Sequence, residues 1–289
     1  NSQTDGGDIR AYSDNTLTTR LPIELVEFDK ATGHILAWVR SNSALAQNAT
    51  IILRTGGNAG QILPVYGEPF GPDEVWAGWE YITHDMATNS VDGTSLTLTG
   101  GAASAGQGNL NARTYNGLTD SSDIANVAVA ATGTLFAQTF RTGNGGSGFG
   151  RMRHSPNGPD FHYNSSRYTI ELEDGTATDP EFYIASPALS TWFDHAVSWS
   201  NETTPIFYEN GVSQSVTVVQ AFVGTFQPVT ETIALGNHDP ALHNRGWAGR
   251  LCETWETSLV KSAAFCAARS AMLSAPSTFM TAGTGGASP

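Results

Sequence analysis

The first part of the chain alternates apolar and polar residues in short bursts. Alternation at every second position is typical of β-strands that bury one face. Turn-forming pairs separate the bursts, among them Thr32-Gly33 and Asn48-Ala49. We therefore predict a small β module at the N-terminus, with strands over residues 21–28, 35–39 and 50–53.

A second region continues the same alternation over a greater length. Its apolar segments are short and bounded by Gly, Asn, Ser and Thr, which favours antiparallel strands joined by tight turns. Asn210-Gly211 is the strongest turn signal, because both residues accept the positive φ of a two-residue hairpin. The pattern predicts an all-β fold, an antiparallel jelly-roll sandwich. Its expected strands cover residues 95–99, 124–131, 134–141, 168–172, 192–199, 206–209 and 233–235.

One segment, residues 261–273, has the composition of a helix. It is rich in alanine, places Phe265, Met272 and Leu273 at a helical period, and ends before Pro276. We expect this short C-terminal helix to cover the sandwich.

Glycine-rich stretches at residues 56–60 and 67–71 interrupt the strand pattern and indicate a domain boundary. We therefore divide the chain into three parts. These are residues 1–66, a partial N-terminal β module; residues 67–275, the sandwich; and residues 276–289, a flexible tail of small polar residues.

The formal charge is −13 over 289 residues, and the chain has two lysines, Lys30 and Lys261. So acidic a chain offers little to neutralise a phosphate backbone, which excludes nucleic acid as a partner. No run of about 18 apolar residues occurs, so we expect no membrane insertion. The acidic balance suits either solubility or cation binding.

Four blocks of the second region carry a family resemblance: residues 192–199 (WFDHAVSW), 206–212 (IFYENGV), 233–237 (IALGN) and 247–253 (WAGRLCE). In this order they resemble the laminin-G-like domain, one of the concanavalin A-like lectin and glucanase sandwiches. The resemblance covers roughly residues 75–275. It implies a core strand, a hairpin with an Asn-Gly turn, and a closing strand before a short helix.

The N-terminal module carries a second resemblance, in residues 7–10 (GDIR), 21–24 (LPIE), 37–39 (AWV) and 50–53 (TIIL). These residues resemble the domain of unknown function catalogued as 2341, which often precedes such sandwiches in secreted microbial proteins. The strands that the family has before Asp8 are missing, so we expect an open sheet edge between Ile9 and Phe28 that pairs with another polypeptide. The resemblance implies an extracellular location or the surface of a cell or virion.

Concanavalin-like sandwiches include glycosidases that place two carboxylates beside a sugar bond. Glu253 and Glu256 are three residues apart, which puts their side chains on opposite faces of a regular strand. Glu171 and Glu173 alternate correctly but lack a third acidic partner. We therefore favour structural roles for these residues and predict a protein that is not an enzyme.

Aromatic and histidine residues are the candidates for ligand binding. Aromatic faces can stack on sugar rings, although core packing is the alternative for each of them. The histidines on either side of Asp160 lack the spacing of a zinc finger or metalloprotease. The candidates are Trp76, Trp79, Tyr81, His154 and His162.

Two further pairs of residues predict specific chemistry. Asn237 and Asp239 lie in an oxygen-rich loop that suits calcium, and a loop hydrogen-bonded to itself is the alternative. Cys252 and Cys266 fall in adjacent predicted elements, so we expect a disulfide, with two buried thiols as the alternative.

These observations favour a glycan-binding or adhesive surface protein, whose partner is a glycan. The first alternative is a structural subunit of a virion or extracellular filament, whose partner is a neighbouring protein subunit. The second alternative is a divergent glycoside hydrolase. Folds of this kind serve many functions, so the site has to decide between these hypotheses.

Overall fold

The chain forms two units in the computed structural model. The first holds Asn1–Trp79 with Ser90–Thr94, and the second holds Glu80–Asn89 with Ser95–Pro289. The division falls after Trp79, later than the predicted boundary after residue 66. The predicted tail, 276–289, lies outside the described residues. The structure describes residues 6–32, 34–42, 50–56, 62–107, 110–143, 149–164, 166–172, 178–237 and 245–274.

The segment after residue 66 belongs to the first unit because Trp76 is anchored there. It follows the short helix α1 (Pro72–Val75), which begins at a proline whose fixed φ suits the first helical turn. Trp76 is buried, and its indole N–H donates to the carboxylate of Glu24. Its ring also packs edge-on against Trp38, with centroids 5.5 Å apart. These contacts tie the segment to the strands of the first unit.

The first unit contains two small antiparallel sheets. Their strands are β1 (Arg10–Tyr12), β2 (Arg20–Leu21), β3 (Ile23–Asp29), β4 (His34–Val39) and β5 (Ile52–Arg54). One sheet has the order β2-β1-β5, and the other pairs β3 with β4. The three strands predicted here are thus confirmed. The strand β1 has a neighbour on each side, and assembly through this module stays a prediction.

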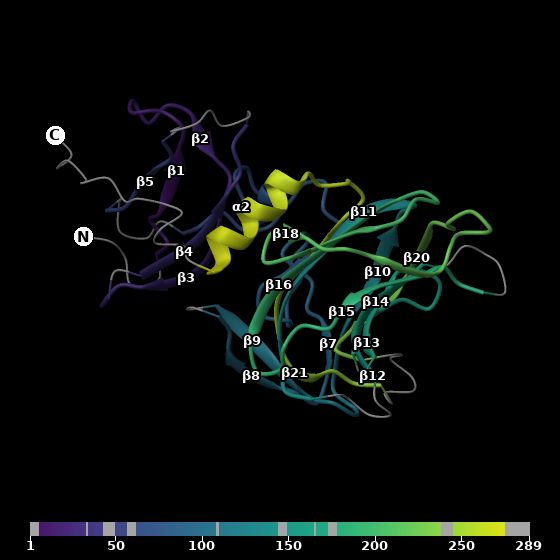
Figure 1. Ribbon diagram of the computed structural model, residues 1–289. Coiled ribbons are helices and arrows are strands. Elements are labelled where there is room, and N and C mark those ends of the chain that lie inside the picture. The colour runs from purple at the N-terminus through teal and green to yellow at the C-terminus, as the bar shows by residue number, and fades with distance from the viewer. Residues whose placement is uncertain are drawn as a thin grey trace. The chain divides into compact units, whose positions relative to one another are not determined.

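The second unit is an antiparallel β-sandwich, which confirms the predicted all-β, jelly-roll-like fold (Figure 1). Sheet I contains, in spatial order, β19 (Thr217–Gln220), β15 (Glu181–Ala185), β14 (Arg167–Glu171), β13 (Asp160–Asn164), β12 (Phe149–His154), β20 (Val229–Leu235), β10 (Ser121–Val129) and β7 (Thr97–Thr99). Sheet II contains β18 (Val212–Ser213), β17 (Ile206–Glu209), β16 (Trp192–Ser200), β11 (Thr132–Arg141), β21 (Ala248–Thr257), β9 (Asn111–Asn116) and β8 (Ala102–Ala105), with β6 (Tyr81–Thr83) also paired to β21.

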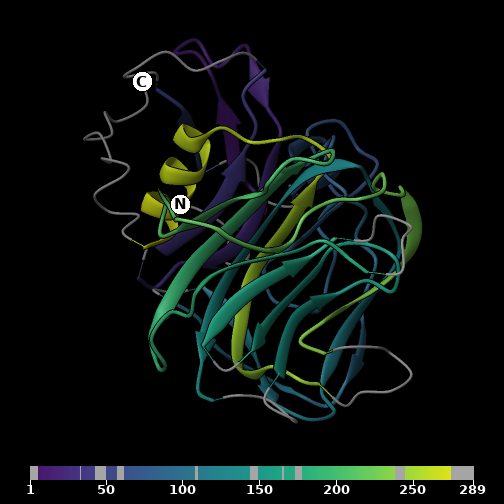
Figure 2. The same cartoon turned by 45° about the vertical axis from the view of Figure 1, so that its right-hand side comes forward.

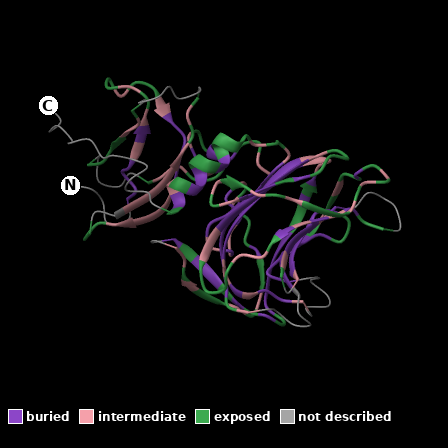
Figure 3. Ribbon diagram, viewed as in Figure 1, coloured by how far each residue is buried: buried purple, intermediate pink, exposed green. Residues whose placement is uncertain are grey.

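The core lies between the inner faces of these two sheets, which stack face to face (Figure 2). Each strand sends every second side chain inward, so buried residues concentrate in the strands of both sheets (Figure 3). Sheet II contributes Leu135, Val197 and Leu251, and sheet I contributes Phe161 and Ile170. The same alternation turns the remaining side chains of sheet I outward, where the candidate site lies.

The predicted hairpin turn at Asn210-Gly211 joins β17 to β18. Its residues have φ of 49° and 77°, as a two-residue hairpin of this kind requires. Glu209 and Val212 are paired on either side of it. The turn prediction is therefore confirmed.

The predicted C-terminal helix is α2 (Ala263–Ser274), which lies over the outer face of sheet II beside β18 (Figure 1). The hydroxyl of Ser262 accepts a hydrogen bond from the Phe265 N–H and caps the first turn. The buried face differs from the predicted one: it carries Cys266, Arg269, Ser270 and Leu273, while Phe265 is partly exposed. Among the residues that the structure describes, no helix is long and apolar enough to cross a membrane.

Strand β21 contains a bulge that sets the direction of its later side chains. Phe136 pairs with Trp255 and Gln138 pairs with Cys252, so one residue of β11 faces two residues of β21. Glu253 takes up the extra length with φ of 52°. Cys252 and Trp255 therefore share the outer face although they are three residues apart.

Candidate functional site

The outer face of sheet I gathers polar side chains on four adjacent strands, β12 to β15. In β13, Phe161 and Tyr163 belong to the core, so Asp160 and His162 point to the opposite face. In β15, Phe182 is in the core and the neighbouring Tyr183 is half-buried on the outer face. The alternation of the sequence thus produces one apolar and one polar face.

The strand register arranges these outward residues in two rows. In the first row, His162 stands opposite Arg151 on one side and Thr169 on the other, and Thr169 stands opposite Tyr183. In the second row, Asp160 stands opposite Glu171, which stands opposite Glu181. We call the following set the polar face: Arg151, His154, Asp160, His162, Arg167, Thr169, Glu171, Glu181 and Tyr183.

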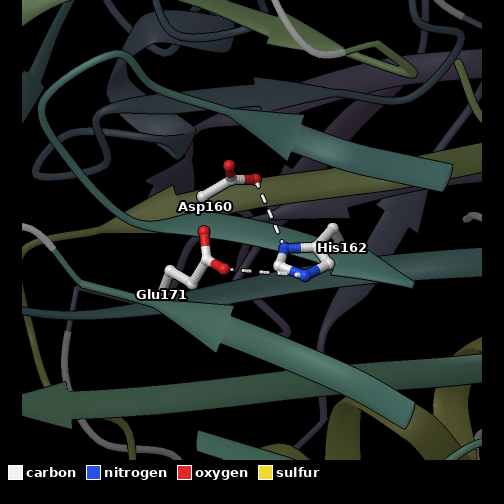
Figure 4. Close-up of side chains that lie close together, drawn as sticks. All are labelled: Asp160, His162 and Glu171. Atoms are coloured by element: carbon white, nitrogen blue, oxygen red, sulfur yellow. Dashed lines mark ion pairs between the residues drawn. The ribbon is translucent and has the colours of Figure 1, made fainter. Parts of the chain in front are cut away.

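Asp160 is the centre of the contacts on the polar face. Its Oδ2 forms a close ion pair with Nη1 of Arg151 and lies 3.1 Å from Nδ1 of His154. Its Oδ1 lies 3.9 Å from Nδ1 of His162. Nε2 of the same imidazole lies 3.8 Å from Oε1 of Glu171, so one histidine ring faces both carboxylates (Figure 4).

Burial changes the titration of two groups on this face. The pKa of Arg151 is lowered to about 10, because burial disfavours its charge more than Glu171 favours it. The pKa of Glu171 is raised, first by burial, which Arg151 opposes and Glu181 reinforces. Glu171 therefore takes up a proton at higher pH than an exposed glutamate does.

The far end of the polar face carries an aromatic ring. The guanidinium of Arg167 lies over the ring of Tyr183, 4.3 Å from its centroid. This arrangement holds the ring in place by a cation–π contact. The face thus combines charged groups at β12 and β13 with a supported aromatic side chain at β15.

The structure brings together the two histidines predicted from sequence, since His154 and His162 both lie beside Asp160. Sequence reasoning missed Arg151 and Thr169, and it considered Glu171 only as a catalytic acid. The available signal was the hairpin of β13 and β14. Pairing Asn164 with Arg167 places Glu171 directly opposite Asp160.

The predicted aromatic candidates lie elsewhere. Trp76 is buried in the first unit, and Tyr81 is fully buried in the core of the second. Neither ring offers an open face for stacking, because each is packed among core residues. Trp79 is half-buried and packs edge-on against Trp76, with centroids 6.1 Å apart. A ligand-binding role for Trp79 stays a prediction.

The side chain of Asn237 is fully buried and engaged by the backbone. Its amide N–H groups donate to the carbonyl oxygens of Leu118 and Asp120, and its oxygen accepts the N–H of Arg245. Its predicted partner, Asp239, lies outside the described residues. Calcium binding by this pair stays a prediction.

The predicted disulfide is absent, because Cys252 and Cys266 are both free and buried. The thiol of Cys252 instead donates to Oε1 of Gln138, 3.0 Å away on the neighbouring strand. This contact follows from the sheet register, which pairs the two residues directly. The alternative of two buried thiols is the one observed.

The two acidic residues of β21 form separate ion pairs. Glu253 contacts Nδ1 of His84 at 2.9 Å, and Glu256 contacts Arg153 of the opposite sheet. All four side chains are buried. These carboxylates are therefore held in structural contacts.

Solved structures with the same fold include the receptor binding domain of botulinum neurotoxin C/D mosaic serotype. It matches with a TM-score of 0.50 and 10% identity over 67% of this chain and 51% of that one. The binding domain of Paraclostridial mosquitocidal protein 1 matches with a TM-score of 0.51 and 9% identity, over 67% and 52% of the two chains. This chain thus spans about half the length of these neighbours. At such identities the likeness shows the β-sandwich fold alone.

No protein-family model and no curated protein matches the chain. The laminin-G-like resemblance and that of the N-terminal module therefore stay predictions. The β-sandwich itself is established by the strand order.

Proposed function

We propose that this chain is a non-catalytic glycan-binding protein whose ligand lies on the polar face. The observation that carries the proposal is the half-buried ring of Tyr183, held by Arg167 at the end of a row of polar side chains on four neighbouring strands. Sugars are bound by side chains that donate to and accept from hydroxyl groups, and by aromatic rings that cover their apolar faces. Tyr183 provides the ring, and the partly exposed side chains of Arg167, Glu171 and Glu181 provide the hydrogen-bonding groups.

The fold is compatible with this role. Of the two neighbours described above, one is a receptor binding domain and the other a binding domain. The proposal includes a location outside the cell or on a surface, where glycans are available. Because one fold serves many functions, the fold is only compatible with glycan binding, and the polar face is the reason for proposing it.

A glycosidase would use a pair of carboxylates such as Asp160 and Glu171. The geometry argues against this, because the His162 ring faces both carboxylates and Arg151 holds Asp160 in an ion pair. Asp160 is buried and held by Arg151, so Glu171 lacks the second available carboxylate that glycoside hydrolysis needs. Release of reducing sugar from a glycan that the protein binds would contradict the non-catalytic assignment.

A second candidate is a structural subunit that works through an interface. The strand β19 forms one edge of sheet I, and its Val218 and Val219 are both exposed. No charge or proline protects this edge. Exposed apolar edge strands favour pairing with another chain. Native mass spectrometry at micromolar concentration separates the two candidates, since this one requires stable assemblies.

Glycan-array screening of the full chain, followed by calorimetry with the best ligand, tests the first proposal. Tyr183→Ala is expected to weaken binding about tenfold, equivalent to loss of roughly 1.4 kcal/mol of stacking. Trp192→Ala is the matched control, because Trp192 also lies beside an arginine, Arg250, but on the outer face of sheet II. Equal affinities of wild type and Tyr183→Ala would show that the ligand binds elsewhere.

A further inference from the structure

Three side chains at the centre of the polar face have the composition of a metal site. Asp160, His162 and Glu171 each offer one ligand atom, and these atoms lie within 4.8 Å of one another. Asp160 and Glu171 stand directly opposite each other on β13 and β14, and His162 follows Asp160 by two residues on β13 (Figure 4). We propose that they bind a divalent transition metal ion, with zinc as the best match.

The distances favour an ion over a direct hydrogen-bonded cluster. Nδ1 of His162 lies 3.9 Å from Oδ1 of Asp160, and its Nε2 lies 3.8 Å from Oε1 of Glu171, both beyond hydrogen-bond length. A single ion would use only one of these two nitrogens. Ligand atoms about 2.0 to 2.2 Å from a tetrahedral zinc ion lie roughly 3.4 Å apart. One ligand atom from each of the three residues lies within 4.8 Å of the others, so side-chain rotations would bring one nitrogen and two carboxylate oxygens onto one ion.

Buried oxygen atoms point to a missing partner at this position. Among the described residues, Oδ1 of Asp160 and the hydroxyl of Thr169 have no hydrogen-bond partner, and both side chains are more than nine-tenths buried. Thr169 stands opposite His162, so its hydroxyl is on the same face. Buried polar atoms are nearly always satisfied, and a bound cation with its water would satisfy these.

The local charge also favours a cation. Arg151 pairs with Oδ2 of Asp160 and leaves Oδ1 facing His162, and outer partners of this kind orient metal-binding carboxylates. Arg151 and Arg245 contribute positive charge around Glu171. The carboxylates of Asp160, Glu171, Glu181 and Asp179 outnumber them, so the surplus is negative.

The ligand types select the class of metal. One imidazole and two carboxylates suit zinc and its neighbours, whereas calcium takes oxygen ligands only. Three protein ligands leave a position open for water or for a hydroxyl group of a bound molecule. This metal site does not depend on the proposed glycan function, because metal binding is measured on the protein alone.

The test uses the full chain after treatment with a chelator. Cobalt(II) replaces zinc in such sites and gives visible absorption bands that report its coordination. We expect one equivalent of cobalt to bind with saturable bands, zinc to displace it, and calcium to leave it in place. Zinc should also raise the melting temperature, because it binds the folded state.

Two variants of similar chemistry make the test specific. Glu171→Gln keeps the side-chain size at a position whose side chain is 34% exposed, and it should abolish the cobalt bands without unfolding the protein. Glu231→Gln is the matched control, because Glu231 is a partly buried carboxylate of the same sheet that lies outside the polar face, and this variant should bind cobalt like wild type. Zinc-edge X-ray absorption of the wild-type protein should show one imidazole among oxygen ligands.

Absence of a saturable site, equal loss of binding in both variants, or a zinc shell without imidazole would each overturn the proposal. The outcomes also remain distinct from those of glycan binding. Cobalt bands without glycan affinity would support the metal site and contradict the proposed function. Glycan affinity without cobalt bands would support the proposed function and contradict the metal site.

Discussion

Arg153 of sheet I and Glu256 of sheet II form a bidentate ion pair in the interior of the sandwich. Nε lies 2.8 Å from Oε2 and Nη2 lies 3.1 Å from Oε1, and both residues are almost completely buried. Burial alone would lower the pKa of Arg153, but Glu256, with contributions from Tyr81 and Glu231, more than offsets this and raises it. Each charge is tolerated in the core because the other is present.

Removing one partner of this pair should be far more harmful than removing both. Glu256→Gln leaves a buried guanidinium without its counter-charge and is expected to lower the free energy of unfolding by about 3 to 5 kcal/mol. The double variant Arg153→Met with Glu256→Leu should recover most of that loss. Urea denaturation measures both values. A single-variant loss below about 1 kcal/mol would show that the pair contributes little.

His195 should make the second unit sensitive to acid. Its ring is buried, with its centroid 4.2 Å from that of the Tyr168 ring. Burial, together with the charge of Arg141, lowers the pKa of His195 from 6.5 to about 3. Between these pH values the unfolded chain binds a proton that the folded chain does not. The free energy of unfolding is therefore highest, as far as His195 is concerned, above pH 6.5. It falls between pH 6.5 and pH 3 by up to about 1.4 kcal/mol per pH unit.

Urea denaturation at several pH values between 4 and 7 measures this effect. In His195→Phe, the slope of the unfolding free energy against pH should decrease by the amount that one proton contributes, about 1.4 kcal/mol per pH unit. The comparison of slopes cancels any constant loss from repacking. Parallel pH profiles for the two proteins would contradict the assignment, whatever the absolute stabilities are.

Both cysteines should be reduced yet unreactive in the native protein. Burial raises the pKa of the Cys266 thiol to about 11 and that of Cys252 well above its usual value. The thiolate is the reactive form, so alkylation at pH 8 should be slow until the protein is denatured. Intact mass should then show two adducts without any reductant. No adduct before reduction would indicate a disulfide after all.

Gly211 should be intolerant of a side chain for two reasons. Its φ of 77° disfavours other residues, and a Cβ there would lie 2.7 Å from the Cα of Ala267 in α2. Gly67 in the first unit has φ of 79° but open space around its Cβ position. Gly67→Ala should therefore cost about 1 to 2 kcal/mol of backbone strain in its own unit. Gly211→Ala should cost more, and equal losses would mean that α2 yields easily.

The strand positions could be read from the sequence because each strand has one apolar face. Alternation identified β16 and β17, and the Asn210-Gly211 pair identified the turn between β17 and β18. The buried face of α2 could not be read in the same way. Arg269 is buried there because it pairs with Asp194 and stacks on Trp255, contacts between residues distant in sequence.

The candidate site was only half visible in the sequence. His154 and His162 drew attention because histidine is rare and lies near an acidic residue, but the rows of the polar face depend on strand pairing. Thr169 has an ordinary side chain, and its position opposite His162 is a property of the register. The boundary after Trp79 depends on the contact between Trp76 and Glu24, which are 52 residues apart in the chain.

The bulge at Glu253 has a consequence for any comparison of this chain with its relatives. A relative whose closing strand is regular would align with β21 only through a one-residue gap at this position. An alignment without the gap would match Trp255, which faces α2, with a residue that faces the other sheet, and would match Glu256, which faces Arg153 of the other sheet, with a residue of the outer face. Deleting Glu253 would instead make the strand regular: Thr254 alone would face Ala137, Trp255 and Glu256 would keep their present sides, and the contact with His84 would be lost.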